Sequence, residues 1–177
     1  FALQASLAVA LSVADSGSQT IRQIVLSSAV VTTLAGTTGA SGNTDGTGPT
    51  ARFLNPFGIA ADGAGNVYVA DSFNHTIRKI VVSTKVVTTL AGSAGLSGTT
   101  DGNGNLARFY DPFAVGIDGN GNLFVADTDN HSVRRLVLAT NAVTTLAGNG
   151  TLGISDGTGQ AARFNRPSGV AVDGAGN

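Results

Sequence analysis

The chain has 177 residues, with 10 basic and 11 acidic side chains and a formal net charge of −1. It contains no cysteine, which excludes a disulfide framework, a thiolate metal site and a cysteine nucleophile. The near-zero charge argues against binding to a nucleic-acid backbone, which needs a surplus of lysine and arginine, and the 25 glycines together with many Thr, Ser, Asn and Val residues favour strands and tight turns.

The first 14 residues, FALQASLAVALSVA, are apolar but too short to span a bilayer, which takes roughly 20 residues. They resemble the apolar part of a signal peptide, but no basic segment precedes them. In the register of the repeat described next, Phe1 corresponds to Phe57. We therefore expect a degenerate copy of the repeat here, in which residues 6–10 replace a glycine-containing turn and weaken the expectation of a first hairpin.

The sequence repeats with a period of 56 residues, shortened once to 55. Four motifs carry this period: Val-Ala-Asp from Val13, Val69 and Val125; Thr-Thr-Leu-Ala-Gly from Thr32, Thr88 and Thr144; Asp-Gly-x-Gly from Asp45, Asp101 and Asp156; and Ala-Arg-Phe from Ala51, Ala107 and Ala162. The missing residue falls between Gly148 and Asp156, as expected of a surface loop. A period of this length indicates stacked units of one kind.

One repeat is predicted to consist of four short strands and no helix. In the copy that starts at Phe53, the expected strands are residues 58–62, 67–71, 76–82 and 86–91. The segment Asp62-Gly-Ala-Gly-Asn66 is a predicted turn in which glycine supplies a positive φ. Four antiparallel strands repeated at about 50 residues predict an all-β fold, a β-propeller of four-stranded blades that pack face to face.

Two segments carry a closer resemblance, Val69-Ala-Asp-Ser-Phe-Asn-His-Thr-Ile-Arg-Lys-Ile80 and Val125-Ala-Asp-Thr-Asp-Asn-His-Ser-Val-Arg-Arg-Leu136. With the preceding Pro-Phe-Gly-Ile-Ala-Ala-Asp-Gly-Ala-Gly-Asn, they resemble the NHL repeat. The resemblance implies a β-propeller, most often of six blades, that acts as a binding or scaffolding surface. The first copy departs from it, with Ser18-Gln19 in place of Asn-His.

The predicted organisation is one propeller domain of about three repeats. We expect a degenerate first blade at residues 1–36, a second blade with its leading loop at 37–92, a third at 93–148, and the loop and first strand of a further blade at 149–177. The sequence stops inside a predicted hairpin, which indicates part of a larger ring. A half-propeller that pairs with a second copy is the alternative.

Connections alternate between the two ends of a blade, so three long glycine-rich loops (36–50, 92–106 and 148–160) share one face with the turns 71–75 and 127–131. Because binding residues concentrate on loops that a rigid scaffold holds, this loop-rich face is the predicted binding face. Its candidate residues are Asp71, Asn74, His75, Asp127, Asp129, Asn130, His131, Arg52, Arg108 and Arg163.

Each candidate also has a structural interpretation. His75 and His131 could form a metal or acid–base pair, but their recurrence at equivalent positions favours residues that brace a turn. Asp15, Asp71 and Asp127 stand seven residues before Arg22, Arg78 and Arg134, which favours hydrogen bonds or ion pairs inside each blade. Arg52, Arg108 and Arg163 are predicted to tether the long loops to Asp45, Asp101 and Asp156.

Calcium is the cofactor with some support in the sequence. The segments 101–105 and 118–122 alternate Asp or Asn with Gly, as calcium loops do, but Leu follows each and no Glu exists to close the site. Because hairpin turns need the same residues, we expect no cofactor and no metal site. No motif of nucleophilic, zinc-dependent or phosphate chemistry is present, so no catalytic residue is assigned.

Three segments fit the acceptor pattern for N-glycosylation, at Asn149, Asn74 and Asn130. Together with the Ser- and Thr-rich, Lys-poor composition, they lead us to expect an extracellular or cell-surface protein. The expected function is a non-enzymatic module that binds a protein, a glycan or another copy of itself. A lactonase- or lyase-like propeller with an axial metal and an RNA-binding propeller remain alternatives, although nucleic acid is disfavoured by the charge.

Overall fold

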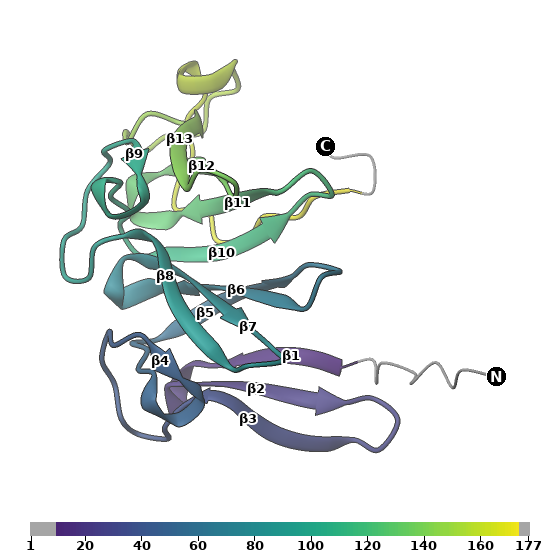
Figure 1. The fold of residues 1–177 in the computed structure, drawn as a ribbon. Coiled ribbons are helices and arrows are strands. Elements are labelled where there is room, and N and C mark those ends of the chain that lie inside the picture. The colour runs from purple at the N-terminus through teal and green to yellow at the C-terminus, as the bar shows by residue number, and fades with distance from the viewer. Residues whose placement is uncertain (1–9, 174–177) are drawn as a thin grey trace.

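The computed structural model describes residues 10–173, and in this range every regular element is a β-strand or a single 3₁₀ turn (Figure 1). Three antiparallel sheets follow one another along the chain and stack side by side. The all-β propeller architecture predicted from the repeat is confirmed.

The second and third sheets have four main strands each, as predicted. The second contains β5 (Pro56–Ala61), β6 (Asn66–Asp71), β7 (Thr76–Val81) and β8 (Val86–Gly92). The third contains β10 (Pro112–Ile117), β11 (Asn122–Asp127), β12 (Ser132–Val137) and β13 (Ala142–Ala147). We refer to these sheets as the second and third blades.

The first sheet contains β1 (Ala10–Asp15), β2 (Thr20–Val25) and β3 (Val30–Gly36). By the repeat register these are the second, third and fourth strands of a blade, so the sequence that departs from the repeat still folds as expected from Ala10 onward. The predicted first hairpin of this blade lies mostly outside the described residues.

The first two long loops each add a short fifth strand to the blade that follows, which the repeat does not predict. β4 (Gly46–Thr47) pairs with the outer strand β8, and β9 (Gly102–Asn103) pairs with β13. A 3₁₀ turn follows each of them, η2 (Gly48–Thr50) and η4 (Gly104–Leu106). The loop therefore passes over the outer edge of its blade before the chain enters the inner strand.

A further 3₁₀ turn follows the second strand of each blade. The residue after each turn has the left-handed backbone conformation, and these residues are Gln19, His75 and His131. These turns are η1 (Ser16–Ser18), η3 (Ser72–Asn74) and η5 (Thr128–Asn130). One more 3₁₀ turn, η6 (Gly159–Ala161), lies in the third long loop. Residues 162–173 form no strand.

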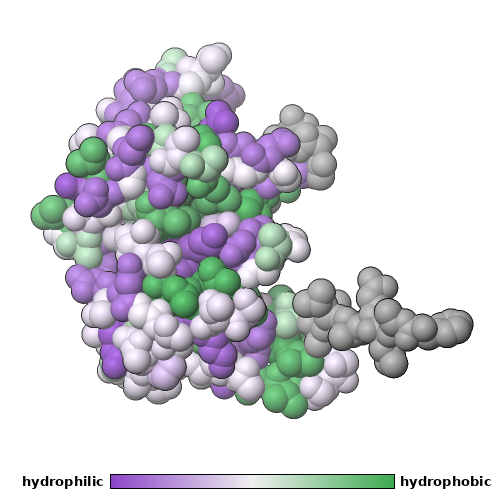
Figure 2. All heavy atoms as spheres, viewed as in Figure 1, coloured by the Kyte–Doolittle hydropathy of each residue, from purple (hydrophilic) through white to green (hydrophobic). Residues whose placement is uncertain are grey.

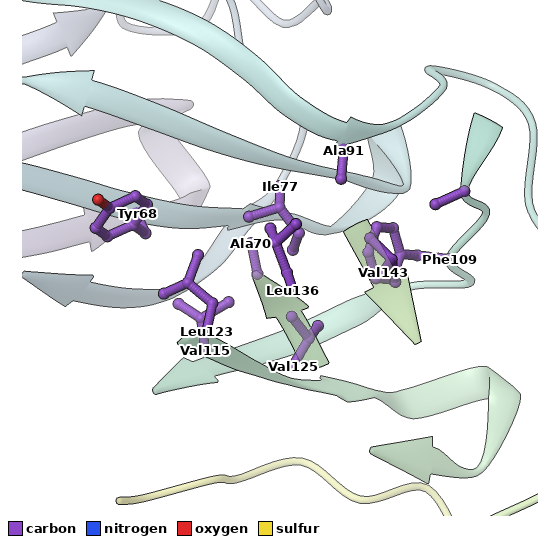
Figure 3. Packing of buried hydrophobic residues seen from close by; sticks show 11 residues of the cluster. Tyr68, Ala70, Ile77, Ala91, Phe109, Val115, Leu123, Val125, Leu136 and Val143 are labelled. Atoms are coloured by element: carbon purple, nitrogen blue, oxygen red, sulfur yellow. The ribbon is translucent and has the colours of Figure 1, made fainter. Parts of the chain in front are cut away.

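The core lies between the blades, and the second strands of the second and third blades, β6 and β11, are buried on both faces. Tyr68 and Ala70 of β6 pack toward the third blade, while Val67 and Val69 pack toward the first. Figure 3 shows the cluster between the second and third blades, which includes Ile77 of β7 and Leu123 and Val125 of β11. Face-to-face stacking thus explains why the second strand reads as an unbroken apolar run.

The innermost strands approach each other closely enough to require glycine. A Cβ atom on Gly58 of β5 would lie 2.5 Å from the Cα atom of Ala114 on β10. No side chain fits in that space, so Gly58 allows the first strands of neighbouring blades to meet around the central axis.

Candidate functional site

The loop-rich face is built on a buried carboxylate at the end of the second strand. Asp71 is fully buried and accepts hydrogen bonds from the backbone N–H of Leu54 (2.8 Å) and from the Asn74 carboxamide (2.8 Å). The Asn74 amide also donates to the carbonyl of Gly42 in the long loop (2.7 Å). One carboxylate thereby holds the turn after β6, the loop before the blade and the start of β5 together.

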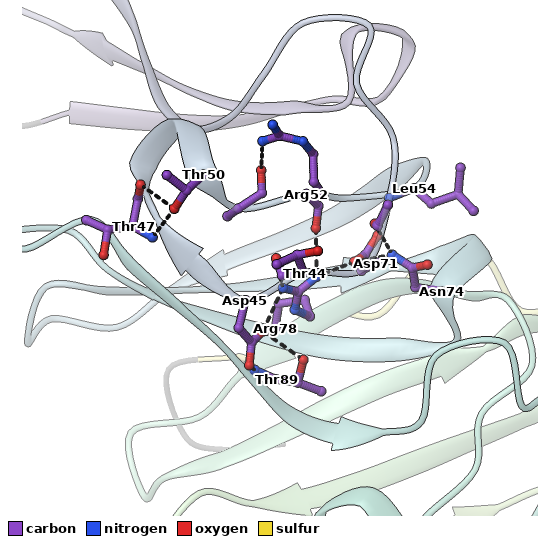
Figure 4. Close-up of polar contacts among 12 residues, drawn as sticks. Thr44, Asp45, Thr47, Thr50, Arg52, Leu54, Asp71, Asn74, Arg78 and Thr89 are labelled. Atoms are coloured by element: carbon purple, nitrogen blue, oxygen red, sulfur yellow. Dashed lines mark hydrogen bonds and ion pairs between the residues drawn. The ribbon is translucent and has the colours of Figure 1, made fainter.

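Arg78 on β7 completes this arrangement (Figure 4). Its guanidinium donates to Asp71 and to Asp45, both at 2.7 Å, and to the backbone carbonyls of Arg52 (3.0 Å) and Thr44 (3.1 Å). The side chain lies over the ring of Phe53 and is 1% exposed. A β-bulge between Ile77 and Arg78 turns the guanidinium toward the loop.

The third blade repeats this network with the same geometry. Arg134 donates to Asp127 and Asp101 at 2.7 Å each and lies over Phe109. The predicted pairing of each third-strand arginine with the aspartate seven residues earlier is confirmed for both blades. In the first blade the pair Arg22–Asp15 is longer, at 3.5 Å, and both side chains are partly exposed.

The predicted tether between Arg52 and Asp45, and its equivalents at Arg108 and Arg163, is wrong. Arg52 donates to the carbonyls of Pro49 (2.6 Å) and Ala51 (2.8 Å) and so closes its own loop. Arg108 does the same with the carbonyls of residues 105 and 107, and Arg163 with those of residues 160–162. Asp45 and Asp101 are already occupied by the third-strand arginines Arg78 and Arg134.

The pKa values of the aspartates follow their surroundings. Burial raises the pKa of Asp71, despite the opposing charge of Arg78 and the hydrogen bonds that it accepts. Burial also acts on Asp101, but the hydrogen bonds from Thr145 and Arg134, together with the charge of Arg134, hold its pKa below the usual value. Asp101 is therefore an ionised, acceptor-only group at neutral pH, and 45% of its side chain is exposed.

The two histidines brace one blade against the next. The Nδ1 atom of His75 accepts the backbone N–H of Asp111 (3.2 Å), and that of His131 accepts the N–H of Arg166 (3.2 Å). In the first blade, Gln19 takes this place and accepts the N–H of Asn55 (2.7 Å). The structure thus supports the bracing interpretation of the histidines: each follows a 3₁₀ turn and contacts the loop before the next blade.

Four of the predicted contact residues are buried and cannot touch a partner. Asp71 and Asp127 are 0% exposed, and Asn74 and Asn130 are 5% exposed. The amide nitrogens of both asparagines donate to protein oxygens, so this fold has no room for a glycan on either of them. Asn149, the third predicted acceptor, is exposed, and its side-chain oxygen accepts the N–H of Thr151.

The other predicted residues of this face are partly exposed. Asp129 pairs with Arg166 at 2.8 Å, and its side chain is 19% exposed. His75 is 15% exposed and meets the ring of Tyr110 edge-on. These contacts place the candidates on the loop-rich face while committing most of their polar atoms to the fold.

The segments with calcium-like spacing use their oxygens on the protein. Asp118 accepts the backbone N–H groups of Asn120 and Asn122 and the amide of Asn122, as a hairpin turn requires. Asp101 binds Arg134 and Thr145. Within residues 10–173 no three His, Cys, Asp or Glu side chains gather in a group that could hold a metal ion.

Two features of the loop-rich face were not predicted. One is a set of exposed apolar side chains on the loops, with Leu96 at 53%, Leu106 at 67% and Ile154 at 90% exposed; Figure 2 shows hydrophobic surface at the edge where the loop between β8 and β9 lies. The other is a polar cavity of about 250 Å³ beside the third blade. The cavity does not follow the repeat, so the repeat could not reveal it, whereas Leu96 recurs as Leu152, which is 58% exposed.

Three stacked antiparallel sheets, with four main strands in each complete one and long loops that cross from each blade to the next, define a segment of a β-propeller. The family model of the NHL repeat matches residues 53–80. NHL repeat-containing protein 2 of Homo sapiens is 38% identical over 144 residues, which are 77% of this chain and 20% of that protein. The chain therefore carries the NHL repeat on a β-propeller fold, and it spans about a fifth of the length of this relative.

A solved structure supports the same architecture. A protein of unknown function from Bacteroides thetaiotaomicron superimposes with a TM-score of 0.75 at 26% sequence identity, over 93% of this chain and 40% of that chain. An auxiliary nutrient binding protein from the same organism superimposes with a TM-score of 0.73 at 21% identity, over 94% and 41%. At 21% identity, the similarity to the auxiliary nutrient binding protein is a similarity of fold. Among the described residues no helix is long and apolar enough to cross a membrane.

Proposed function

We propose that this chain is part of a non-enzymatic propeller module that binds a protein partner through its loop-rich face. The observation that carries the proposal is the set of apolar side chains displayed on loops that do not depend on a partner for their shape. Leu96 and Leu106 are more than half exposed, and both lie in the loop that Asp101 ties to the buried Arg134. Exposed apolar groups in one place mark interaction sites.

The fixed shape of the loops supports binding rather than a purely structural role. A loop ordered in advance loses little conformational entropy when a partner docks, so more of the contact energy appears as affinity. Arg78 and Arg134 supply this order from inside the blade, at the cost of burying charged groups.

The use of the polar side chains supports a non-enzymatic role. Nδ1 of each histidine accepts a backbone N–H group, and the two most buried aspartates are paired with arginine. An extracellular location and the absence of a metal cofactor stay predictions from the sequence.

Quantitative affinity capture from extracts of the source organism tests the proposal. The double variant Leu96→Asp/Leu106→Asp places two charges on the loop face, whereas the control Leu26→Asp changes a side chain of similar exposure, 58%, in the turn between β2 and β3 at the opposite face. We expect the wild type and the control to retain the same partners and the double variant to lose them by at least tenfold. Equal capture by all three proteins would refute the proposal.

Light scattering of the same three proteins identifies the partner when it is a second copy. A concentration-dependent dimer that the double variant abolishes would assign the loop-rich face to self-association. A dimer that survives in the double variant would assign self-association to another surface and leave the capture result to decide the proposal.

A further inference from the structure

The polar cavity on the loop-rich face lies where the repeat is broken. It is lined by the long loop before the third blade (Thr99 and Asp101), by the blade itself (Ser132 and Thr145) and by the loop after it (Asn149, Gly150 and Gln160). The second of these loops is the one that lacks a residue relative to its counterpart. In the counterpart, Ser93 and Leu96 close a bridged turn, whereas here the Asn149 side chain caps a tighter turn at Thr151.

Two residues around the cavity are smaller than their equivalents in the second blade, which enlarges the cavity. The equivalents of Ser132 and Gly150 in the second blade are Thr76 and Ala94, so the third blade lacks a methyl group at both positions. A Cβ atom on Gly150 would lie 3.7 Å from the methyl group of Thr99 and would narrow the opening. Two further cavity residues differ in type from their second-blade equivalents: Thr99 corresponds to Asn43, and Gln160 corresponds to Asn105.

A hydroxyl group at the position of Ser132 has no partner within the blade. In the second blade the hydroxyl of Thr76 is buried without a hydrogen bond. Ser132 is 4% exposed and lines the cavity, and its hydroxyl forms no hydrogen bond among the described residues. A buried polar group of this kind is stabilised when a ligand supplies its hydrogen bond.

The remaining polar groups around the cavity are held in place and partly unused. Asp101 is fixed by Arg134 (2.7 Å) and by the hydroxyl and N–H of Thr145 (3.0 and 3.1 Å), and its exposed side leaves room for another donor. Within residues 10–173, the side chains of Thr99 and Gln160 make no hydrogen bond, and the Asn149 amide is free to donate because only its oxygen is engaged. The lining thus offers both donors and acceptors in a fixed arrangement.

The chemistry of the lining selects the class of ligand. The one charged group, Asp101, is already paired with Arg134, and no cation faces the cavity to attract an anion. The lining carries hydroxyl, carboxamide and carboxylate groups in preference to apolar surface, which does not suit an apolar ligand. A volume of about 250 Å³ is below the range of drug-sized pockets, about 300–1,000 Å³, and fits a single small ring.

From these observations we propose that the cavity between the second and third long loops binds one neutral monosaccharide unit, with Ser132, Asp101, Asn149 and Gln160 as its hydrogen-bonding partners. The site does not require the protein partner proposed above, because Leu96 and Leu106 do not line it. The two proposals therefore fail independently.

The test exchanges the cavity residues for those that the second blade already tolerates. The triple variant Thr99→Asn/Ser132→Thr/Gln160→Asn restores the second-blade residues, so folding is expected to survive. The reciprocal triple variant Asn43→Thr/Thr76→Ser/Asn105→Gln is the matched control. The backbone amide signals of Asp101, Thr145 and Gly150 are followed by two-dimensional NMR during titration with D-glucose, D-galactose, N-acetyl-D-glucosamine and the anionic N-acetylneuraminate.

We expect saturable shifts of these amides with at least one neutral sugar, with a Kd on the order of 1 mM. The first triple variant should weaken this binding by about tenfold or more, because a site built to bond hydroxyl groups discriminates strongly when those bonds are lost. The reciprocal variant should bind as the wild type does.

Three results would overturn the proposal. These are the absence of saturable shifts with every sugar, equal binding by both triple variants, and tighter binding of N-acetylneuraminate than of any neutral sugar. Deoxy analogues of the best sugar then assign the hydroxyl groups that are read, and each removed contact is expected to weaken binding. Binding that is unchanged for every deoxy analogue would likewise contradict hydroxyl recognition.

Discussion

Substitution of Arg78 by Met tests whether the buried guanidinium holds the second blade and its loop together. Met fills much of the same volume but removes the partner of Asp71, which stays fully buried. Removing one partner of a buried ion pair typically costs about 3–5 kcal/mol. Asp71 keeps its hydrogen bonds from Leu54 and Asn74, so we expect a loss near the lower end, about 3 kcal/mol.

The comparison variant is Asp45→Asn, which removes the charge at the other end of the same arginine. Because the Asp45 side chain is 48% exposed, its ion pair is screened by water, and we expect a loss of about 1 kcal/mol or less. Lys79→Met, at the next position of β7, controls for the new methionine. Urea unfolding followed by circular dichroism gives the three free energies, and the slope of each transition shows whether unfolding stays cooperative.

The pH dependence provides a second check on Arg78→Met. Burial already raises the pKa of Asp71, and without the arginine charge the pKa rises further. The folded variant then takes up a proton on Asp71, so its stability is lost as the pH rises through this raised pKa. We expect the difference from wild type to shrink between pH 7 and pH 4. A loss no larger than that of Asp45→Asn, or a difference that grows toward acidic pH, would refute the proposed role of Arg78.

Four further predictions concern turns, pH limits and modification. Gly65 has a φ of +84°, so Gly65→Val should cost about 1 kcal/mol or more, whereas Gly63→Val at a position without positive φ should cost less; equal melting temperatures for the two variants would contradict this. Burial and the Asp62 carboxylate raise the pKa of Tyr68 to about 12, so stability present below pH 10 should be lost as the pH rises toward 12, and Tyr68→Phe should flatten that loss in alkaline denaturation. Burial opposes a lowered pKa for Asp118, but hydrogen bonds from the side chain and N–H of Asn122 hold this pKa below its usual value. The stability of the wild type should therefore fall as the pH drops below about 4, and the stability of Asp118→Asn should fall less steeply over that range. When the protein is directed through a secretory pathway, mass spectrometry should find a glycan at Asn149 and none at Asn74 or Asn130; a glycan on the folded protein at either buried asparagine would show that the turn around it is placed wrongly.

The strands could be predicted because their signals are local and repeat three times. The segment predicted as residues 67–71 is observed as β6, Asn66–Asp71, and residues 76–82 as β7, Thr76–Val81. The short strands β4 and β9 could not be predicted, because a strand of two residues is too short to show an alternation of polar and apolar side chains. Their pairing with β8 and β13 also joins residues about 40 positions apart in the sequence. Edge pairing of this kind depends on where the loop is tied down, which no local pattern records.

The polar site could be predicted in part. The pairing of Arg78 with Asp71 follows from a fixed spacing that recurs in each blade. The pairing of Arg78 with Asp45 could not be distinguished from a pairing with Arg52, because both arginines recur with the same period. Only the bulge at Ile77 and Arg78, which aims the guanidinium toward the loop, decides between them.

The ties of each long loop have a consequence for how such a propeller can be recombined. The loop from Gly36 to Phe53 is fastened by Arg78, Asn74 and β8 of the blade that follows it, and by one backbone hydrogen bond from Gly39 to Ser18 of the blade before it. A crossover placed in mid-loop would separate Asp45 from its arginine, whereas one placed at Gly36 or Gly92 would move a blade together with the arginine, the asparagine and the outer strand that hold its leading loop. Residues 37–92 and 93–148 are therefore the transferable cassettes, and chimaeras joined at those glycines should fold where chimaeras joined at Asp45 or Asp101 do not.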